Sequence, residues 1–212
     1  MNKIKEIEVE REYLQKQINY LLKKVGSIPM ASTSLLPYGW RKAAKGRTVW
    51  RIVEEVISQN LEKYAKDLGF EDIIPASSEV GVYDFVFETK EGKVSYVNIK
   101  TSVKGGRRNK DDISKAAGLL DFYTRNPTAN LYTASFIIDF KDDLTVLIEE
   151  CIVFPVSWIP DIYVNPSNNA NLQSSWYKDL DKAEHRTNEE FLIEFKKEIE
   201  VARKKRLAKQ QK

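Results

Sequence analysis

Two stretches of the chain repeat apolar residues at the spacing of an amphipathic helix. Residues 3–25 carry a narrow, heptad-like stripe that a charged residue interrupts at Arg11. Its apolar positions are Ile4, Ile7, Leu14, Ile18, Leu21 and Val25. So narrow a stripe needs an apolar partner, which is either this protein's own core or a second copy of the chain. Residues 47–68 carry a second apolar face, and Gly69 supplies the stop.

After residue 80 the apolar period changes to two, which predicts strands. Residues 82–88 and 94–101 alternate in this way and are joined by a short polar segment, so they predict a hairpin. Residues 131–140 and 144–154 are rich in Thr, Val, Ile and Phe, and they predict further strands.

The other segments complete the predicted order of elements. Residues 111–125 place apolar side chains near one helical face, and Thr187 to Glu190 has the form of a capping box that opens a C-terminal helix. Residues 26–39 and 160–175 are rich in turn-forming residues and predict loops. This order predicts an α/β domain with a mixed central sheet flanked by helices.

Composition narrows the class of protein. The chain has 212 residues, 42% hydrophobic and 31% charged, enough for one domain with a sizeable core. No apolar run approaches the roughly 20 residues that span a bilayer, and the charged N-terminus lacks a signal peptide's apolar segment. A single cysteine, Cys151, excludes an internal disulfide and argues against a zinc site. These features favour a cytoplasmic protein.

The net charge is only +3, but the basic residues are clustered. The clusters are Arg41, Lys42, Lys45 and Arg47, then Lys104, Arg107, Arg108 and Lys110, and then residues 196–212, which hold eight basic residues against Glu198 and Glu200. Such patches can neutralise phosphates. For residues 196–212 alone, a solvated charged face is an equally good interpretation.

The predicted hairpin gathers three polar residues on one face. Asn98 and Lys100 are two apart on a strand, so they point the same way. A three-residue turn of Lys90, Glu91 and Gly92, with the glycine left-handed, would place Asp84 opposite Asn98. The alternative is an ordinary hairpin whose polar face lies in water. The surrounding apolar residues favour a site over that alternative.

Such a site suits phosphodiester hydrolysis. Carboxylate and carbonyl oxygens are the ligands that Mg²⁺ prefers, and the metal activates water and polarises phosphoryl oxygens. A nearby ammonium can stabilise the charge that develops on phosphorus. His185 and Cys151 offer no better scheme, because the first lies in a charged stretch and the second in an apolar strand. No glycine-rich phosphate loop is present.

The spacing Asp84-x13-Asn98-x-Lys100 resembles the PD-(D/E)xK nuclease signature. Residues 83–85 and 98–102 look like the active-site hairpin of type II restriction endonucleases of the blunt-cutting EcoRV and HincII kind. Residues 61–70, 168–173, 177–181 and 187–191 resemble other segments of those enzymes in the same order. Together the matching pieces cover most of residues 47–195.

The resemblance implies a restriction-endonuclease-like core and a role for each matched residue. Asp84 would be a metal ligand, Asn98 would occupy the second acidic position, and Lys100 would be the catalytic lysine. The family often adds a glutamate from the preceding helix, and Glu54 is favoured over Glu55 by its place beside the apolar face and by an ungapped match. Asn98 departs from the signature, which has an acidic residue there. Three explanations are open: a natural variant in which Glu54 compensates, an inactivating Asp→Asn change, or a natural pseudo-enzyme.

The resemblance also implies a DNA-binding surface. Asn and Gln amides can pair with adenine in the major groove, although Asn-rich turns are common. The residues expected to read bases are Asn168, Asn169, Asn171 and Gln173, with Ser77 and Ser78 reaching the other groove. Thr101 and Ser102 are also expected to bind DNA. The residues expected to contact phosphates beside the scissile position are Lys104, Arg107, Arg108 and Lys110.

These inferences divide the chain into three parts. Residues 1–25 form an N-terminal helix used in dimerisation, residues 26–195 form the endonuclease domain with a recognition loop at 165–175, and residues 196–212 form a basic helix or tail. The expected function is Mg²⁺-dependent, sequence-specific cleavage of both DNA strands at a short palindrome by a homodimer, leaving blunt ends. A non-cleaving sequence-specific DNA-binding protein and a junction or repair nuclease with the same core remain alternatives.

Overall fold

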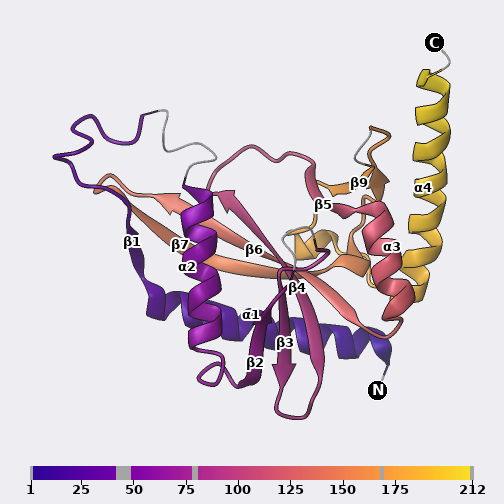
Figure 1. Cartoon of the computed structure of the whole chain (residues 1–212), viewed down its shortest axis with the longest axis horizontal. Helices are drawn as coiled ribbons and strands as arrows, with labels where there is room; N and C mark the ends of the chain where they lie inside the picture. The colour runs from indigo at the N-terminus through magenta and orange to yellow at the C-terminus, as the bar shows by residue number, and fades with distance from the viewer. Residues whose placement is uncertain (1, 42–48, 78–80, 168–169, 211–212) are drawn as a thin grey trace.

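A six-stranded mixed sheet forms the centre of the molecule. The computed structural model describes residues 2–41, 49–77, 81–167 and 170–210 (Figure 1). Within them the strand order is β1-β7-β6-β4-β3-β2, with β4 and β6 parallel and the other neighbours antiparallel. The strands are β1 (Ser27–Pro29), β2 (Phe70–Pro75), β3 (Phe85–Thr89), β4 (Val94–Val103), β6 (Asn130–Phe140) and β7 (Thr145–Pro155). The predicted α/β domain with a mixed central sheet is confirmed.

A second, antiparallel sheet has the order β5-β9-β8. Its strands are β5 (Asp111–Lys115), β8 (Tyr163–Val164) and β9 (Asn171–Ser174). The prediction of a helix over 111–125 is therefore wrong for its first five residues, because β5 pairs with β9 and buries only Ile113. The loops predicted at 26–39 and 160–175 contain the short strands β1, β8 and β9, and β2 was not predicted.

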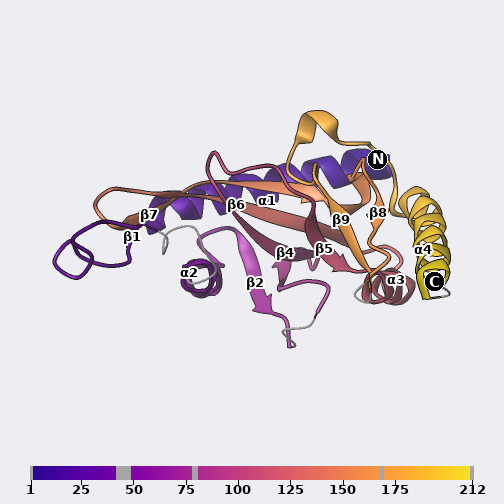
Figure 2. The same ribbon diagram turned by 90° about the horizontal axis from the view of Figure 1, so that it is seen from above.

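Helices cover both faces of the six-stranded sheet (Figure 2). The helix α1 (Lys3–Val25) lies along one face, and α2 (Trp50–Lys63) and α3 (Ala116–Arg125) lie on the other. Short 3₁₀ turns follow at Val156–Trp158 and Leu180–Lys182, and α4 (Asn188–Gln210) ends the described chain. In the described part of the chain, no helix is long and apolar enough to cross a membrane.

The apolar stripe of α1 packs into this protein's own core. Ile7, Leu14, Ile18 and Leu21 are all buried. The helix is also fastened by Glu10, a buried carboxylate that accepts hydrogen bonds from Ser95 and, at 3.0 Å, from Asn130. The apolar partner of the stripe is therefore this protein's own core. The stripe no longer supports the prediction that residues 1–25 form a dimer interface.

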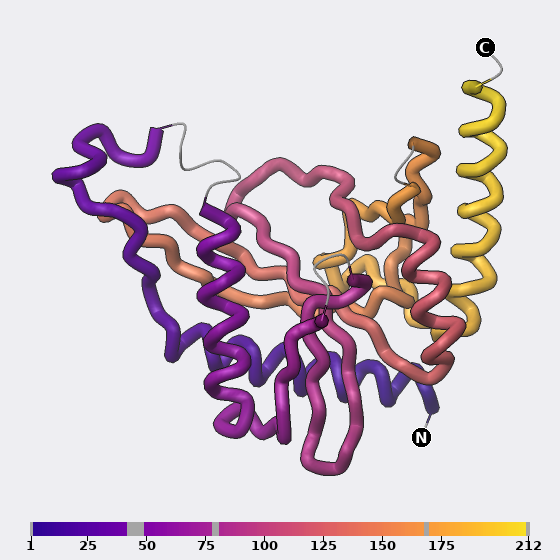
Figure 3. The backbone as a smooth tube through the Cα atoms, in the orientation of Figure 1, coloured from indigo at the N-terminus to yellow at the C-terminus, as the bar shows by residue number. Residues whose placement is uncertain are grey.

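The β3–β4 hairpin, visible at the bottom of the chain trace in Figure 3, has the predicted register. The backbone N–H of Thr89 donates to the carbonyl of Lys93 at 2.9 Å, which leaves three residues in the turn. The last of them, Gly92, has φ of 75°, a conformation that glycine adopts without strain. Phe85 pairs with Val97. The strand begins three residues later than predicted, so Asp84 lies just before it.

The C-terminal helix opens with the predicted capping box. The hydroxyl of Thr187 accepts a hydrogen bond from the backbone N–H of Glu190 at 3.3 Å. In return, the backbone N–H of Thr187 donates to the Glu190 carboxylate at 2.7 Å. Two of the N–H groups that a helix start leaves unpaired are thereby satisfied.

Candidate active site

A cavity of about 530 Å³ opens over β4 between α2, the start of α3, and β5. The structure brings Glu54, Asp84, Asn98 and Lys100 together in its lining, from three separate parts of the chain. Asn98 and Lys100 belong to one strand, and the hairpin register adds Asp84. The helix α2 contributes Glu54, because its buried side holds Val53 and Ile57 and leaves Glu54 at the margin of that side.

The carboxylate of Asp84 is held by backbone. The N–H of Ile99 donates to Oδ2 of Asp84 at 2.5 Å, and the N–H of Asp84 donates to the carbonyl of Val97 at 2.9 Å. Burial raises the pKa of Asp84, while the Ile99 hydrogen bond and the nearby Lys100 ammonium lower it in part. The side chain is thus oriented by backbone and cannot rotate freely.

Asn98 presents an amide oxygen without a protein partner. Its Nδ2 donates to the carbonyl of Val82 at 3.0 Å, which fixes the orientation of the amide. Its Oδ1 is buried and accepts no hydrogen bond from any residue that the structure describes. A buried acceptor left unpaired costs free energy, so this oxygen is suited to a ligand that supplies a positive charge or a donor.

Glu54 lies beside Asp84, whereas Glu55 does not reach the cavity. Oε1 of Glu54 lies 3.5 Å from the hydroxyl of Thr101. Burial, followed by the charge of Asp84, raises the pKa of Glu54 to about 7. Glu55 is exposed and pairs with Gln59 on the outer side of α2. The structure therefore places the glutamate that the sequence favoured in the site.

Lys100 is a half-buried ammonium close to carboxylates. Burial lowers its pKa, and the negative charges of Asp84 and Glu54 partly offset that effect. A cation in this position can attract a phosphate and stabilise negative charge as it develops there. Because Lys100 is partly shielded from water, that electrostatic effect is stronger than at the open surface.

The oxygen donors of the cavity allow a test of the expected Mg²⁺ site. In the described ranges, no three Asp, Glu, His or Cys side chains lie close enough together to hold a metal. The available donors are the carboxylates of Asp84 and Glu54 and the unpaired amide oxygen of Asn98. Mg²⁺ commonly binds one or two carboxylates, keeps several waters and uses substrate phosphate oxygens, so this donor set fits it.

Asp112, which the sequence pattern did not single out, also lines the cavity. The strand β5 carries it there, and its negative charge acts on Lys100. Oδ1 of Asp112 accepts a hydrogen bond from Nε2 of Gln173 at 2.6 Å. The alternation of polar Asp112 and Ser114 around apolar Ile113 is a strand signal, but the helix predicted over 111–125 concealed it.

The residues predicted to read bases have mixed placements. Gln173 is hydrogen-bonded to Asp112, and Asn171 lines the candidate active-site cavity with a buried Oδ1 that has no partner among the described residues. Ser77 is exposed near the end of β2. Asn168, Asn169 and Ser78 lie outside the described residues. Of the two residues after Lys100, Thr101 reaches Glu54, and the hydroxyl of Ser102 is buried without a described partner.

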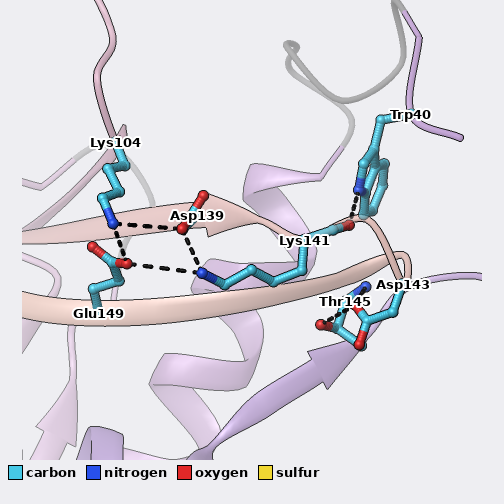
Figure 4. Close-up of polar contacts among 7 residues, drawn as sticks. All are labelled: Trp40, Lys104, Asp139, Lys141, Asp143, Thr145 and Glu149. Atoms are coloured by element: carbon cyan, nitrogen blue, oxygen red, sulfur yellow. Dashed lines mark hydrogen bonds and ion pairs between the residues drawn. The ribbon is translucent and has the colours of Figure 1, made fainter.

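The basic segment after β4 is partly engaged within the protein. Lys104 pairs with Glu149 at 2.6 Å and with Asp139 at 3.7 Å, as Figure 4 shows. Arg108 pairs with Asp179 at 3.2 Å and lies 4.0 Å above the Trp176 ring. The remaining members, Arg107 and Lys110, are exposed, with Lys110 above the Tyr163 ring.

No protein-family model and no curated protein matches the chain. Among solved structures, the chain is similar to the NlaIV restriction endonuclease, with 16% identity and a TM-score of 0.44. The match covers 61% of this chain and 54% of that one, so it spans about half of the NlaIV chain. This likeness concerns the course of the backbone alone, and the interpretation of the site rests on the geometry above.

Proposed function

We propose that the protein is a Mg²⁺-dependent nuclease that cuts both strands of double-stranded DNA at a short palindrome, as type II restriction endonucleases do. One observation carries the proposal: Asp84, Asn98, Lys100 and Glu54 line one cavity, with Asp84 held by backbone and the buried oxygen of Asn98 without a partner among the described residues. An ordinary hairpin does not require this convergence of charged side chains on one cavity, and perturbed charged groups in a cavity favour a functional site.

In this proposal each residue has a chemical role. Bound Mg²⁺ would polarise a phosphoryl oxygen and lower the pKa of its water. Asp84, Glu54 and the amide oxygen of Asn98 would hold the metal. Lys100 would contact the scissile phosphate and stabilise the charge that develops on it. The backbone N–H of Ile99 keeps the Asp84 carboxylate in place throughout.

Three finer parts of the proposal rest on the sequence resemblance. They are the homodimer, the reading of bases by residues 165–175, and the blunt ends. A palindromic site is matched by two-fold symmetry in the protein, which supports the homodimer. Sedimentation of the protein at micromolar concentration, with and without a duplex, tests it, and a monomer under both conditions would remove it.

Asn98 favours one alternative, a sequence-specific DNA-binding protein that does not cleave. A neutral amide brings no charge to the metal, so the site binds a dication less tightly than the family signature would. A junction or repair nuclease with the same core is the other alternative, and the amides of residues 165–173 favour sequence-specific reading over it.

Incubation of plasmid DNA with the protein and Mg²⁺ tests the proposal. Discrete bands are expected for a restriction endonuclease, smearing or structure-specific nicking for the junction or repair alternative, and binding without cutting for the non-cleaving one. Asp84→Ala and Lys100→Ala should lose activity by orders of magnitude while keeping a native melting transition. Glu54→Gln should also lose activity, with Glu55→Gln one position away as the matched control. Near wild-type cutting by Asp84→Ala or Lys100→Ala would remove the proposed site.

A further inference from the structure

The last turns of α4 are strongly basic and exposed. All residues from 203 to 210 are exposed, and the last buried residue of the helix is Ala202. Five of those eight are basic and none is acidic: Arg203, Lys204, Lys205, Arg206 and Lys209. Figures 1 and 2 show this end of the helix beside α3 and the β8–β9 strands.

Three of these side chains line two hollows, one of which adjoins the catalytic cavity. Arg203 and Arg206 border a cavity of about 440 Å³ whose other walls are the start of α3 and residues 164–167. Arg206 and Lys209 border a second hollow against residues 165–167. Spaced three apart, the three side chains share one face of the helix. Ala117 lines both the cavity of about 440 Å³ and the catalytic cavity, so these two cavities are neighbours.

This charge is hardly compensated within the protein. Among the described residues, the one ion pair recorded for residues 203–210 is the 3.8 Å contact between Arg203 and Glu200. Like charges three and four residues apart destabilise a helix slightly, and this end has no buried apolar face to offset that effect. Packing against the same segment of a second copy would bring positive charges together. The surface instead complements a polyanion.

We propose that the row formed by Arg203, Arg206 and Lys209 binds backbone phosphates of DNA that flank the segment in the catalytic cavity. This inference rests on the proposed function for the identity of the polyanion. The row spans about 9 Å of helix, from six residues at roughly 1.5 Å each. One strand of a duplex rises roughly 3.4 Å per phosphate, so the row matches about three consecutive phosphates.

The test measures binding of a scrambled 20-bp duplex without Mg²⁺, across a range of salt concentrations. The Arg203→Gln/Arg206→Gln variant should bind on the order of tenfold more weakly near 0.1 M salt, with a salt slope lower by roughly 1.8, because each phosphate contact contributes about 0.9. The matched control is Lys196→Gln/Lys197→Gln, which removes the same charge from exposed positions of the same helix. The Arg203→Lys/Arg206→Lys variant should restore most of the slope.

The outcomes separate this proposal from the nuclease. Equal losses of DNA affinity in the Arg203/Arg206 and Lys196/Lys197 glutamine variants would mean that only net charge matters, and would overturn the proposal. No recovery in the lysine variant would point to packing and would also overturn it. Tighter binding to phosphatidylserine vesicles than to DNA, lost with the two arginines, would replace DNA by a membrane surface. If DNA binding follows the expected pattern but no Mg²⁺-dependent cutting occurs, phosphate binding by the row is retained and the nuclease proposal is rejected. If the protein cuts DNA but the salt slope of the glutamine variant is unchanged, the nuclease proposal is retained and phosphate binding by the row is rejected.

Discussion

The side-chain amide of Gln173 donates a 2.6 Å hydrogen bond to Oδ1 of Asp112 in the wall of the proposed active-site cavity. The bond joins β9, which carries two of the predicted base-reading residues, to β5. In this arrangement the Gln173 amide N–H is engaged by a carboxylate, which is a stronger acceptor than a neutral group. Reading a base with that N–H would therefore require the bond to Asp112 to be exchanged or shared.

Gln173→Ala tests whether the amide reads DNA or only braces the two strands. If it reads a base, the variant should lose roughly 1–3 kcal/mol of binding to the cognate duplex and little to a scrambled one. Competition binding with the two duplexes measures the difference. Equal losses on both would mean that the amide serves the β5–β9 pairing. The same competition assay on Asn171→Ala tests the other predicted base-reading residue of β9.

Asn98→Asp should strengthen metal binding and weaken the metal-free protein. The new carboxylate adds a negative charge to the donor set, which should lower the Mg²⁺ concentration needed for cleavage by about tenfold or more. It also replaces the amide N–H that now donates to the carbonyl of Val82, so two oxygens would face each other. The melting temperature should therefore fall in EDTA and recover with Mg²⁺. An unchanged Mg²⁺ requirement would place Asn98 outside the metal site.

The raised pKa of Glu54 predicts a pH dependence of stability. The folded protein holds this proton more tightly than the unfolded chain does, because the pKa rises from 4.5 to about 7. The favourable contribution of this group is full below pH 4.5 and is lost as the pH rises through 7. Glu54→Gln, which carries no such charge, should gain stability relative to the wild type over that range. Urea unfolding in EDTA between pH 4.5 and 8 measures it, with Glu55→Gln as control. A difference that does not vary with pH would contradict the assignment.

The basic segment after β4 should contribute unequally to DNA binding. Lys104 is paired with two carboxylates, whereas Arg107 is exposed. Arg107→Ala should reduce the salt slope by about one if this side chain contacts a phosphate. Lys104→Ala should change it less, because Lys104 must first leave Glu149 and Asp139. Salt titrations of duplex binding compare the two variants, and the opposite order would show that DNA displaces those ion pairs.

The sequence by itself determined the elements whose signals are local. The apolar period of residues 3–25 specified α1, and the turn residues up to Gly92 specified the register of β3 against β4. That register brings Asp84 and Asn98 together, because neighbouring positions across a tight turn are fixed by the number of residues in it. The capping box at Thr187 is local in the same sense. The choice of Glu54 over Glu55 also followed from the helical period, since one position turns a side chain by about 100°.

Only the tertiary structure decided what depends on contacts between distant segments. The strand β5 forms because β9, some sixty residues later, supplies its hydrogen-bonding partner, and its short sequence is ambiguous without that partner. For the same reason the sequence could not place Asp112 in the cavity or pair it with Gln173. The stripe of α1 could have served a second copy, and the sheet of this chain takes it instead. Burial also comes from packing, so only the fold shows the raised pKa of Glu54 and the buried oxygen of Asn98, which lacks a partner in the part of the chain that the structure describes.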